Sequence, residues 1–377
     1  MHQPTVAPQA NRDRPLWDVF CRVVDNLGDI GVCWRLAANL ADRGQQVRLW
    51  IDQPEPLRWM APGALDGTIP WIEVIPWKTP LPAGLCDSLA PAHVWVEAFG
   101  CHPPDEAQHA LKQQLASGAV SPVWINLEYL SAESYVERSH GLPSPVMSGP
   151  LKGIGKWFFY PGFTSATGGL LREADLGSRQ AGFDATVWLR QMKLPASPAK
   201  RVSVFCYEPA ALDDLLCQAS ETNRPVQWLV APGRSALAVH QSPATEGLQT
   251  AGCLHYLPPL PQQAFDHLLW ACDLNLVRGE DSLVRAIWAG KPFVWHIYPQ
   301  HDNAHHAKLD AFLDWLEAPL SLRRFHHVWN GMNASASHWP GWDVVNEWQG
   351  CVQAARSRLW SQRDLGTQLI EFAFKNR

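Results

Sequence analysis

The sequence predicts an α/β fold with two Rossmann-like domains that face each other across a crevice. The chain has 377 residues, of which 46% are hydrophobic and 18% charged, enough to bury two cores of ordinary domain size. In each half, short apolar runs alternate with segments whose apolar residues recur at helical spacing. Such alternation is typical of parallel sheets whose strands are joined by helices.

The first half of the chain contains a series of alternating elements. A largely apolar run over residues 17–24 predicts the first strand, and a turn over 25–31 leads into a helix over 32–42. The further elements that we expect are strands at 47–51, 72–77, 94–99 and 123–127, and a helix at 105–115. Together they predict an N-terminal Rossmann-like domain over residues 1–170.

The second half repeats this order after a connecting segment. Residues 128–169 are rich in proline and glycine and predict loops, and the partly helical residues 171–200 predict a linker. A C-terminal Rossmann-like domain is expected over 201–359, with strands at 202–206, 226–230, 274–277 and 293–298 and helices at 209–216 and 262–271. The chain ends in a helical pattern, and we expect the last helix, about 360–377, to pack back on the first domain.

Composition and charge argue against several classes of function. The formal net charge of −5 argues against a general nucleic-acid binder. Residues 1–15 are polar without an apolar signal core, and no apolar run is long enough to cross a membrane. The nine cysteines include no Cys-x-x-Cys pair, which favours reduced core thiols over disulfides or a metal site. We therefore expect a soluble, cytoplasmic protein with no membrane and no nucleic-acid partner.

The segment Arg-Gly-Glu-Asp-Ser at 278–282 is the most informative part of the chain. It joins a predicted strand to a predicted helix, so the backbone N–H groups near Asp281 and Ser282 would point out of a helix N-terminus. Such an end can bind a phosphate, and Arg278 adds a cation beside it. Tyr298 opens a second polar loop after the next strand, on the same rim of the sheet. The alternative is an ordinary αβ unit with a charged turn.

Two aspartates, Asp25 and Asp29, lie with Gly28 and Gly31 in the first predicted turn. An acidic turn that faces a crevice is a poor site for phosphate but suits a general base or a cationic acceptor. The alternative is that Asp29 caps the helix and Asp25 satisfies the amides of the turn. The turn lacks the Gly-x-Gly-x-x-Gly pattern of dinucleotide-binding sites. On residues alone, the two interpretations are about equally good.

Aromatic and amide side chains in the second half have the chemistry that a pyrimidine base requires. Gln262 and Phe265 open a predicted helix and offer edge pairing and stacking, although the pattern alone favours core packing for Phe265. Phe205 and Tyr207 end the first strand of the second domain and leave the same two possibilities open. Glu280 and Asp281 are placed to accept hydrogen bonds from sugar hydroxyls or to hold Arg278.

Metal-binding patterns in the sequence are weak. His301, His305 and His306 have a spacing that metal ligands could use, but no cysteine or second carboxylate cluster accompanies them. No Asp-x-Asp motif follows a strand. We therefore predict no metal and no cofactor, with phosphate charge handled by a helix N-terminus and an arginine.

Four stretches resemble the EarP family of protein-arginine rhamnosyltransferases, glycosyltransferases that modify a single arginine of bacterial elongation factor P. They are FCRVVDNLGDIGVCWRLA at 20–37, NLEYLSAESYVERSHGLPSP at 126–145, FFYPGF at 158–163 and RGEDSLVRAIWAGKPFVWHIYPQ at 278–300. The stretches are spread over most of the chain, and the first and last are specific to the family.

The resemblance implies a GT-B glycosyltransferase, whose donor dTDP-β-L-rhamnose binds mainly to the C-terminal domain. It implies transfer to the arginine at a loop tip of elongation factor P, with inversion at the anomeric carbon. It implies catalytic roles for Asp25, Asp29 and Glu280. The donor-binding residues that it implies are Tyr207, Gln262, Phe265, Arg278, Asp281 and Ser282, and from their positions we add Phe205 and Tyr298.

An arginine acceptor is chemically demanding, because its guanidinium is protonated and its lone pairs are delocalised. We therefore expect Asp29 to accept a proton from the attacking nitrogen while Asp25 holds the other edge of the guanidinium. Two other functions stay open: a GT-B enzyme with another acceptor, such as a lipid or glycan, and a non-catalytic module that binds elongation factor P or a nucleotide.

Overall fold

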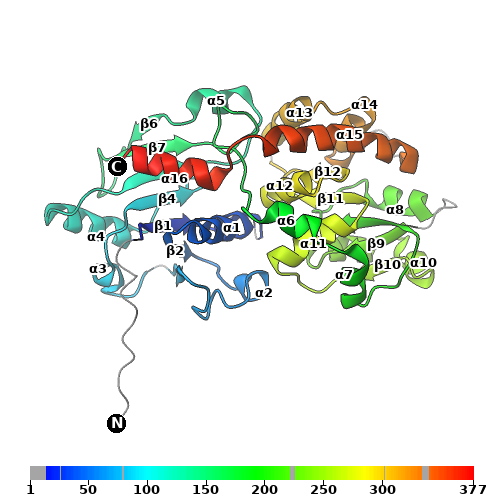
Figure 1. Cartoon of the computed structure of the whole chain (residues 1–377), viewed down its shortest axis with the longest axis horizontal. Coiled ribbons are helices and arrows are strands. Elements are labelled where there is room, and N and C mark those ends of the chain that lie inside the picture. Colours follow the sequence, from blue (N-terminus) through cyan, green and yellow to red (C-terminus); the bar gives the residue numbers. More distant parts are fainter. Residues whose placement is uncertain (1–13, 26, 79, 221–225, 301, 333–338) are drawn as a thin grey trace, which may run out of the picture.

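The protein consists of two parallel β-sheets, each flanked by helices and placed side by side (Figure 1). The computed structural model describes residues 14–377 except 26, 79, 221–225, 301 and 333–338. The polar segment 1–13 and His301, both considered above, lie outside the described residues. In the described part of the chain, no helix combines the length and the apolar character that a membrane crossing requires.

The first sheet has seven strands in the order β3-β2-β1-β4-β5-β7-β6. Its strands are β1 (Leu16–Cys21), β2 (Gln46–Ile51), β3 (Ile72–Pro76), β4 (Val94–Ala98), β5 (Val123–Leu127), β6 (Pro143–Pro145) and β7 (Gly155–Phe159). The helices of this half are α1 (Gly28–Asp42), α2 (Leu57–Met60), α3 (Leu85–Ser88), α4 (Asp105–Ala116) and α5 (Ser134–Ser139). All strand pairs are parallel except β6 with β7.

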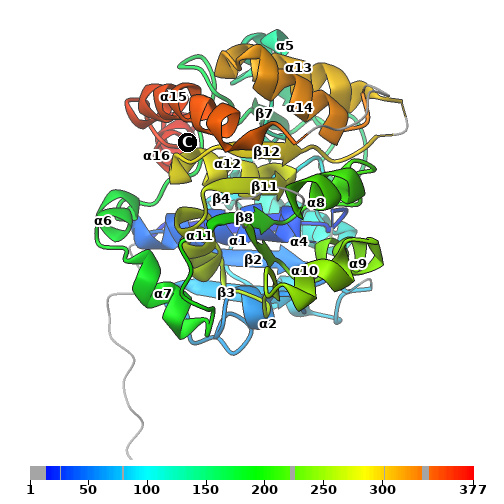
Figure 2. The ribbon, with the colours of Figure 1, turned by 90° about the vertical axis from the view of Figure 1, so that its right-hand side faces the viewer.

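The second sheet has five parallel strands in the order β10-β9-β8-β11-β12. They are β8 (Lys200–Val204), β9 (Val226–Val230), β10 (Leu254–Tyr256), β11 (Leu274–Arg278) and β12 (Phe293–His296). The accompanying helices are α8 (Leu212–Ser220), α9 (Arg234–Gln241), α10 (Thr245–Thr250), α11 (Gln262–Ala271), α12 (Gly279–Ala289), α13 (Ala304–Leu316), α14 (Leu320–Trp329) and α15 (Gly341–Trp360). Figure 2 shows this sheet toward the viewer, with β12, β11 and β8 following one another across it.

The strand order reverses between β1 and β4 in one sheet and between β8 and β11 in the other. In open α/β sheets, ligands bind outside the carboxyl ends of the strands at such a reversal. The turn after β1 and the turn after β11 both start a helix at this point, and α1 packs against α12. The topology therefore brings the two predicted functional segments, 25–31 and 278–282, to the same crevice.

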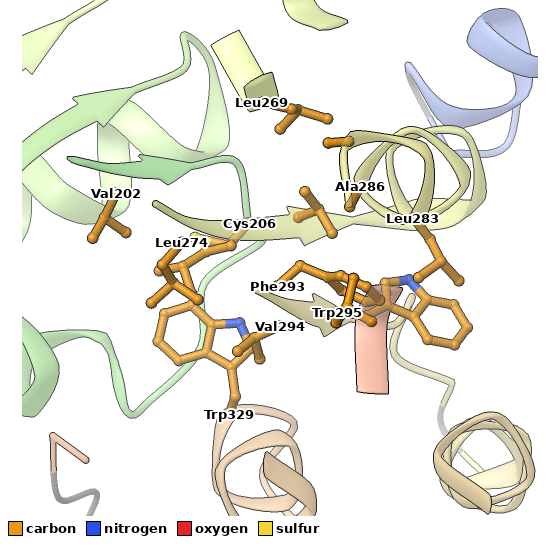
Figure 3. Close-up of a cluster of buried hydrophobic side chains, with 14 of the residues drawn as sticks. Val202, Cys206, Leu269, Leu274, Leu283, Ala286, Phe293, Val294, Trp295 and Trp329 are labelled. Atoms are coloured by element: carbon orange, nitrogen blue, oxygen red, sulfur yellow. The ribbon is translucent and has the colours of Figure 1, made fainter. Parts of the chain in front are cut away.

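The second sheet is fixed by a large apolar core (Figure 3). Phe293 and Trp295 of β12 and Trp329 of α14 belong to this core, and all three side chains are buried. Strand β11 is buried along its whole length, as expected for a parallel strand covered on both faces. Helix α12 ends at Gly290, whose φ of 66° lies in the left-handed region that favours glycine. The start of α12 follows directly after β11 and is therefore anchored in this buried core.

Two short helices, α6 (Leu176–Ala181) and α7 (Ala185–Gln191), lie between the two sheets in the sequence. Helix α16 (Leu365–Lys375) returns to the first sheet, where Figure 1 shows it above β4 and beside β7. It packs against α1, and its residues Leu365, Leu369 and Ala373 belong to the apolar core of the first half.

The structure differs from the sequence-based expectations at several places, three of which concern the site or the segment between the domains. The first strand ends at Cys21, because the N–H groups of Val23 and Val24 bind the carboxylates of Asp52 and Asp29 instead of a neighbouring strand. Helix α1 begins at Gly28, so Asp29 lies in its first turn and not ahead of it. The proline-rich residues 128–169 were expected to be loops, but they contain α5, β6 and β7.

Candidate active site

Two cavities open at the crevice where α1 faces α12. We call them the apolar cavity, of about 250 Å³, and the acidic cavity, of about 210 Å³. The apolar cavity is lined by Phe205, Leu260, Phe265, Trp59, Met60, Gln262, Arg278, Asp281 and Ser282, among others. The acidic cavity is lined by Asp29, Glu280, Phe99, Tyr129, Tyr298, His305 and Lys308, among others. Asp25 and Gly28 line both, so the cavities meet at the turn after β1.

Arg278 is a buried cation at the edge of the apolar cavity. Its guanidinium lies 4.8 Å from the ring centroid of Phe205 and 4.6 Å from that of Tyr207. The side chain is 5% exposed, and its Nη1 has no hydrogen-bond partner among the described residues. An unpaired buried N–H group costs free energy, which an anionic ligand at this point would recover.

The turn that follows Arg278 is closed by the hydroxyl of Ser282. Ser282 Oγ accepts a hydrogen bond from the backbone N–H of Arg278 at 3.1 Å and donates one to the backbone oxygen of the same residue. Gly279 adopts a φ of 64°, and a Cβ at this position would lie 3.3 Å from the carboxylate of Asp25. Ser282 therefore shapes the start of α12, and Gly279 allows the two halves to approach each other.

The aromatic residues predicted to bind a base also line the apolar cavity. The rings of Phe205 and Phe265 meet edge to face, with centroids 5.3 Å apart. Phe265 also packs against the core of the second half, so the two interpretations of this residue are compatible. An aromatic wall next to a buried cation suits a nucleotide, whose base is apolar on its faces and whose phosphates are anionic.

Asp29 is a buried carboxylate with an unusual pKa. Its side chain is 4% exposed, and Oδ2 accepts hydrogen bonds from the N–H groups of Val24 at 2.8 Å and Asp25 at 2.9 Å. Burial raises the pKa of Asp29 to about 6, and the charges of Asp25 and Glu280 add to the rise, against the lowering effect of the two N–H groups. Among the described residues, Asp29 thus binds the amides at the start of the turn, the task that the alternative interpretation gave to Asp25. A carboxylate with this pKa is ionised at neutral pH and is a competent proton acceptor.

Asp25 is bound from the opposite half of the molecule. The hydroxyl of Tyr207 donates to Asp25 Oδ2 at 2.6 Å. Burial and the charge of Asp25 raise the pKa of Tyr207, so the phenol stays protonated and acts as a donor. Tyr298, which is 40% exposed, meets Tyr207 edge to face with ring centroids 5.6 Å apart. The predicted catalytic turn and the predicted donor side are therefore in direct contact.

Glu280 lies in the acidic cavity and is held on both oxygens. Lys308 Nζ donates to Oε1 at 2.7 Å, and the N–H of Leu130 donates to Oε2 at 2.8 Å. Glu280 therefore does not hold Arg278, one of the two tasks considered for it from the sequence.

Two residues predicted to bind the donor use their polar atoms to bind the first half of the chain. Gln262 Nε2 donates to the backbone oxygen of Gly31 at 2.8 Å, and Asp281 pairs with Arg35 at 2.8 Å. Arg35 also pairs with the buried Asp266 at 2.9 Å. The apolar cavity is lined by Gln262, Asp281 and Arg35. Their contacts therefore form part of its wall and also join the two halves.

Sequence reasoning missed several residues of the site. Phe99 and Tyr129 stack with centroids 4.5 Å apart and form an aromatic wall of the acidic cavity. Phe99 is the last residue of one predicted strand and Tyr129 follows the end of another, a signal that could have identified them. Lys308 and Arg35 left no such signal, since their partners are distant in sequence. Within the described ranges, no group of three or more His, Cys, Asp or Glu side chains could hold a metal ion.

Comparisons with known proteins point to one family. The sequence profile described as "Elongation-Factor P (EF-P) rhamnosyltransferase EarP" matches residues 17–374. A protein-arginine rhamnosyltransferase of Pseudomonas aeruginosa is 38% identical, over 94% of this chain and 98% of the relative. One of Pseudomonas putida is 41% identical over the same shares.

Solved structures agree with this result. A structure described as the structural basis for EarP-mediated arginine glycosylation of translation elongation factor EF-P is 28% identical, with a TM-score of 0.60, over 96% of this chain and 99% of that one. A UDP-glucosyltransferase from Polygonum tinctorium, 13% identical with a TM-score of 0.54, covers 98% of this chain and 99% of its own and supports the fold alone. The GT-B fold predicted from the sequence is confirmed. From the profile match and the identity over nearly the whole length, the chain belongs to the EarP family of elongation factor P rhamnosyltransferases.

Proposed function

We propose that the protein transfers L-rhamnose from dTDP-β-L-rhamnose to an arginine side chain of elongation factor P, with inversion at the anomeric carbon. The observation that carries this proposal is the pairing of two cavities of opposite character at Asp25. One cavity has a buried guanidinium and aromatic rings, which suit a nucleotide diphosphate, and the other has three carboxylates, which suit a guanidinium. Family membership supplies the identity of the sugar and of the acceptor protein.

The donor would lie in the apolar cavity. Phe205 and Phe265 would contact thymine, and the unpaired Nη1 of Arg278 would bind the pyrophosphate together with the N-terminus of α12. When the bond between C1 of rhamnose and the β-phosphate oxygen breaks, its electron pair stays on dTDP. These groups would stabilise that charge without a metal. Gln262, Asp281 and Ser282 would act by keeping the cavity closed and shaped, and Tyr298 would border the sugar.

The acceptor arginine would enter the acidic cavity. As the new C–N bond forms, Asp29 would take the proton of the attacking nitrogen, for which a pKa of about 6 is well suited. Asp25, oriented by the hydroxyl of Tyr207, would hold the other edge of the guanidinium and set the direction of attack. Glu280 would accept hydrogen bonds from the rhamnose hydroxyls or support positive charge on the sugar ring. Nitrogen would approach from the face opposite dTDP, which inverts C1.

The test is an intact-mass measurement of elongation factor P after incubation with this protein and dTDP-rhamnose. A mass gain of one deoxyhexose, mapped to an arginine by peptide fragmentation, is the expected result. Tight binding of elongation factor P with no mass gain would favour the non-catalytic module. Transfer to a lipid or glycan, with none to elongation factor P, would favour another acceptor. We place the reaction in the cytoplasm, where translation factors act.

A further inference from the structure

Lys308 of α13 holds Glu280 in the acidic cavity. Its Nζ donates to Glu280 Oε1 at 2.7 Å and lies 5.6 Å from the ring centroid of Tyr129. The other oxygen of Glu280 accepts a hydrogen bond of 2.8 Å from the backbone N–H of Leu130, in the first half of the chain. The carboxylate is thus bound from α13 on one oxygen and from the segment after β5 on the other, and its direction is fixed.

Lys308 also sets the charge balance of this cavity. The lining contains three carboxylates, those of Asp25, Asp29 and Glu280, and its basic side chains among the described residues are Lys308 and His305. Burial lowers the pKa of His305, so this imidazole is neutral at pH 7. Lys308 is therefore the cation of the lining that offsets the carboxylates.

We propose that Lys308 is a positioning residue for the transfer reaction, which keeps the carboxylate of Glu280 fixed in direction beside Asp29 and the donor sugar. This inference rests on the function proposed above, since it gives Lys308 a task in the reaction of that site. Lys308 acts through Glu280 and touches neither the reacting carbon nor the attacking nitrogen. Without it, Glu280 would be a mobile carboxylate with no cation beside it and two aspartates in the same cavity.

The proposal has a consequence for pH dependence, because several titratable groups surround Glu280. They are Lys308 and His305 of α13, Asp25 and Asp29 of the turn after β1, Tyr129 of the segment after β5, Tyr135 of α5 and Tyr298 after β12. Burial and its acidic neighbours already bring the pKa of Asp29 to about 6. Because Lys308 lines the same cavity as Asp29, we expect loss of this cation to move the pKa of Asp29 further upward.

The chain offers a matched control in Lys156 of β7. Lys156 Nζ donates to Glu97 Oε1 at 2.8 Å and lies 5.8 Å from a ring centroid of Trp124. This arrangement of a lysine, a glutamate and an aromatic ring repeats that of Lys308, and Lys156 lines neither cavity. Lys156→Met therefore reports the structural cost of losing such a pair without touching the site.

The experiment compares wild type with Lys308→Met, Lys308→Arg and Lys156→Met, following rhamnosylation of elongation factor P by intact mass. We expect Lys308→Met to lower kcat by about 10- to 100-fold, as small displacements of an orienting group do. We expect each KM to change less than about 3-fold, and the acidic limb of kcat/KM to move up by roughly half a pH unit or more. Lys308→Arg should recover both kcat and the limb. Lys156→Met should keep the wild-type values, whatever its melting temperature.

Three results would overturn the inference. The first is a Lys308→Met variant with the wild-type kcat and acidic limb. The second is a defect confined to the KM of dTDP-rhamnose, which would make Lys308 a donor ligand. The third is a defect that arginine does not recover. Calorimetric binding of dTDP verifies that the methionine variant is folded, and Lys308→Gln replaces it if it is not. If wild type itself transfers no rhamnose, the proposed function fails, a result distinct from these three.

Discussion

The two cavities of the crevice differ in the balance of their charges and in the origin of these charges. In the apolar cavity, Arg35 and Arg278 face Asp25 and Asp281, and the guanidinium of Arg278, at the end of β11, has an unpaired nitrogen among aromatic rings of the second half. The acidic cavity takes Asp25 and Asp29 from the first half and Glu280 from the second. An anionic donor and a cationic acceptor would each meet the opposite charge. The difference indicates that donor binding and acceptor binding are separated between the two cavities, and only partly between the two halves of the chain.

The largest expected effect comes from removing the proton acceptor of the acidic cavity. Asp29→Asn should keep the fold and dTDP binding but lose transfer by about 10²-fold or more, because the amide cannot take a proton. The control is Asp52→Asn, since Asp52 also accepts a backbone N–H, from Val23 at 3.0 Å, but lines neither cavity. Single-turnover rates of both variants decide the matter. Near-normal turnover of Asp29→Asn would refute its role as the base.

A pair of variants should separate donor binding from acceptor binding. Phe265→Ala should weaken dTDP by roughly 1–3 kcal/mol, the usual value of a base-stacking ring, and leave binding of elongation factor P nearly unaltered. Asp25→Ala should show the reverse pattern, with dTDP affinity kept and engagement of the arginine lost. Calorimetry with both ligands on both variants measures this. Unchanged dTDP affinity in Phe265→Ala would mean that Phe265 serves the core alone.

One contact between the two halves, in which Glu173 pairs with Arg285 of α12 and Arg35 of α1, should respond to acid. Burial by itself would raise the pKa of Glu173, but the guanidiniums of Arg285 and Arg35 lower this pKa from 4.5 to about 2. The ionised form is favoured in the folded state, so this stabilisation is complete above pH 4.5 and disappears as the pH falls toward 2. Glu173→Gln should cost on the order of 1–3 kcal/mol at neutral pH, with the difference from wild type shrinking below about pH 4.5. Urea denaturation across this pH range checks it, and a difference independent of pH would contradict the assignment.

The smallest expected effect concerns metal ions. Transfer should persist in EDTA, because Arg278 and the N-terminus of α12 are expected to handle the pyrophosphate charge. The measurement is the rate of rhamnosylation with and without chelator, and with added magnesium. Loss of activity that magnesium restores would show that the apolar cavity does not bind the diphosphate in the way proposed.

Local patterns predicted the framework of the site. Strand β9 occupies residues 226–230, as expected, because these residues form a short apolar run, and helix α11 occupies residues 262–271, as expected, because its apolar residues recur at helical spacing. The turn at 278–282 starts a helix for the same reason. Strand β7 was missed because a five-residue strand among prolines and glycines has too few positions to show a period.

Contacts across the crevice could not be predicted from spacing. The partner of Asp281 is Arg35, 246 residues away in sequence, and the partner of Tyr207 is Asp25, 182 residues away. These pairs depend on how the two sheets face each other, which no local periodicity encodes. The same holds for the raised pKa of Asp29, because its main cause is burial by the assembled molecule.

The return of α16 to the first sheet has a consequence for synthesis on the ribosome. Leu365 and Leu369 are buried in the core of the half that is translated first, beside α1. While the chain grows, that half emerges with part of its apolar surface uncovered, and the helix that covers it is made only after the whole second half. The nascent N-terminal half therefore stays incomplete until α16 has been made, a period in which exposed apolar surface invites chaperones or aggregation.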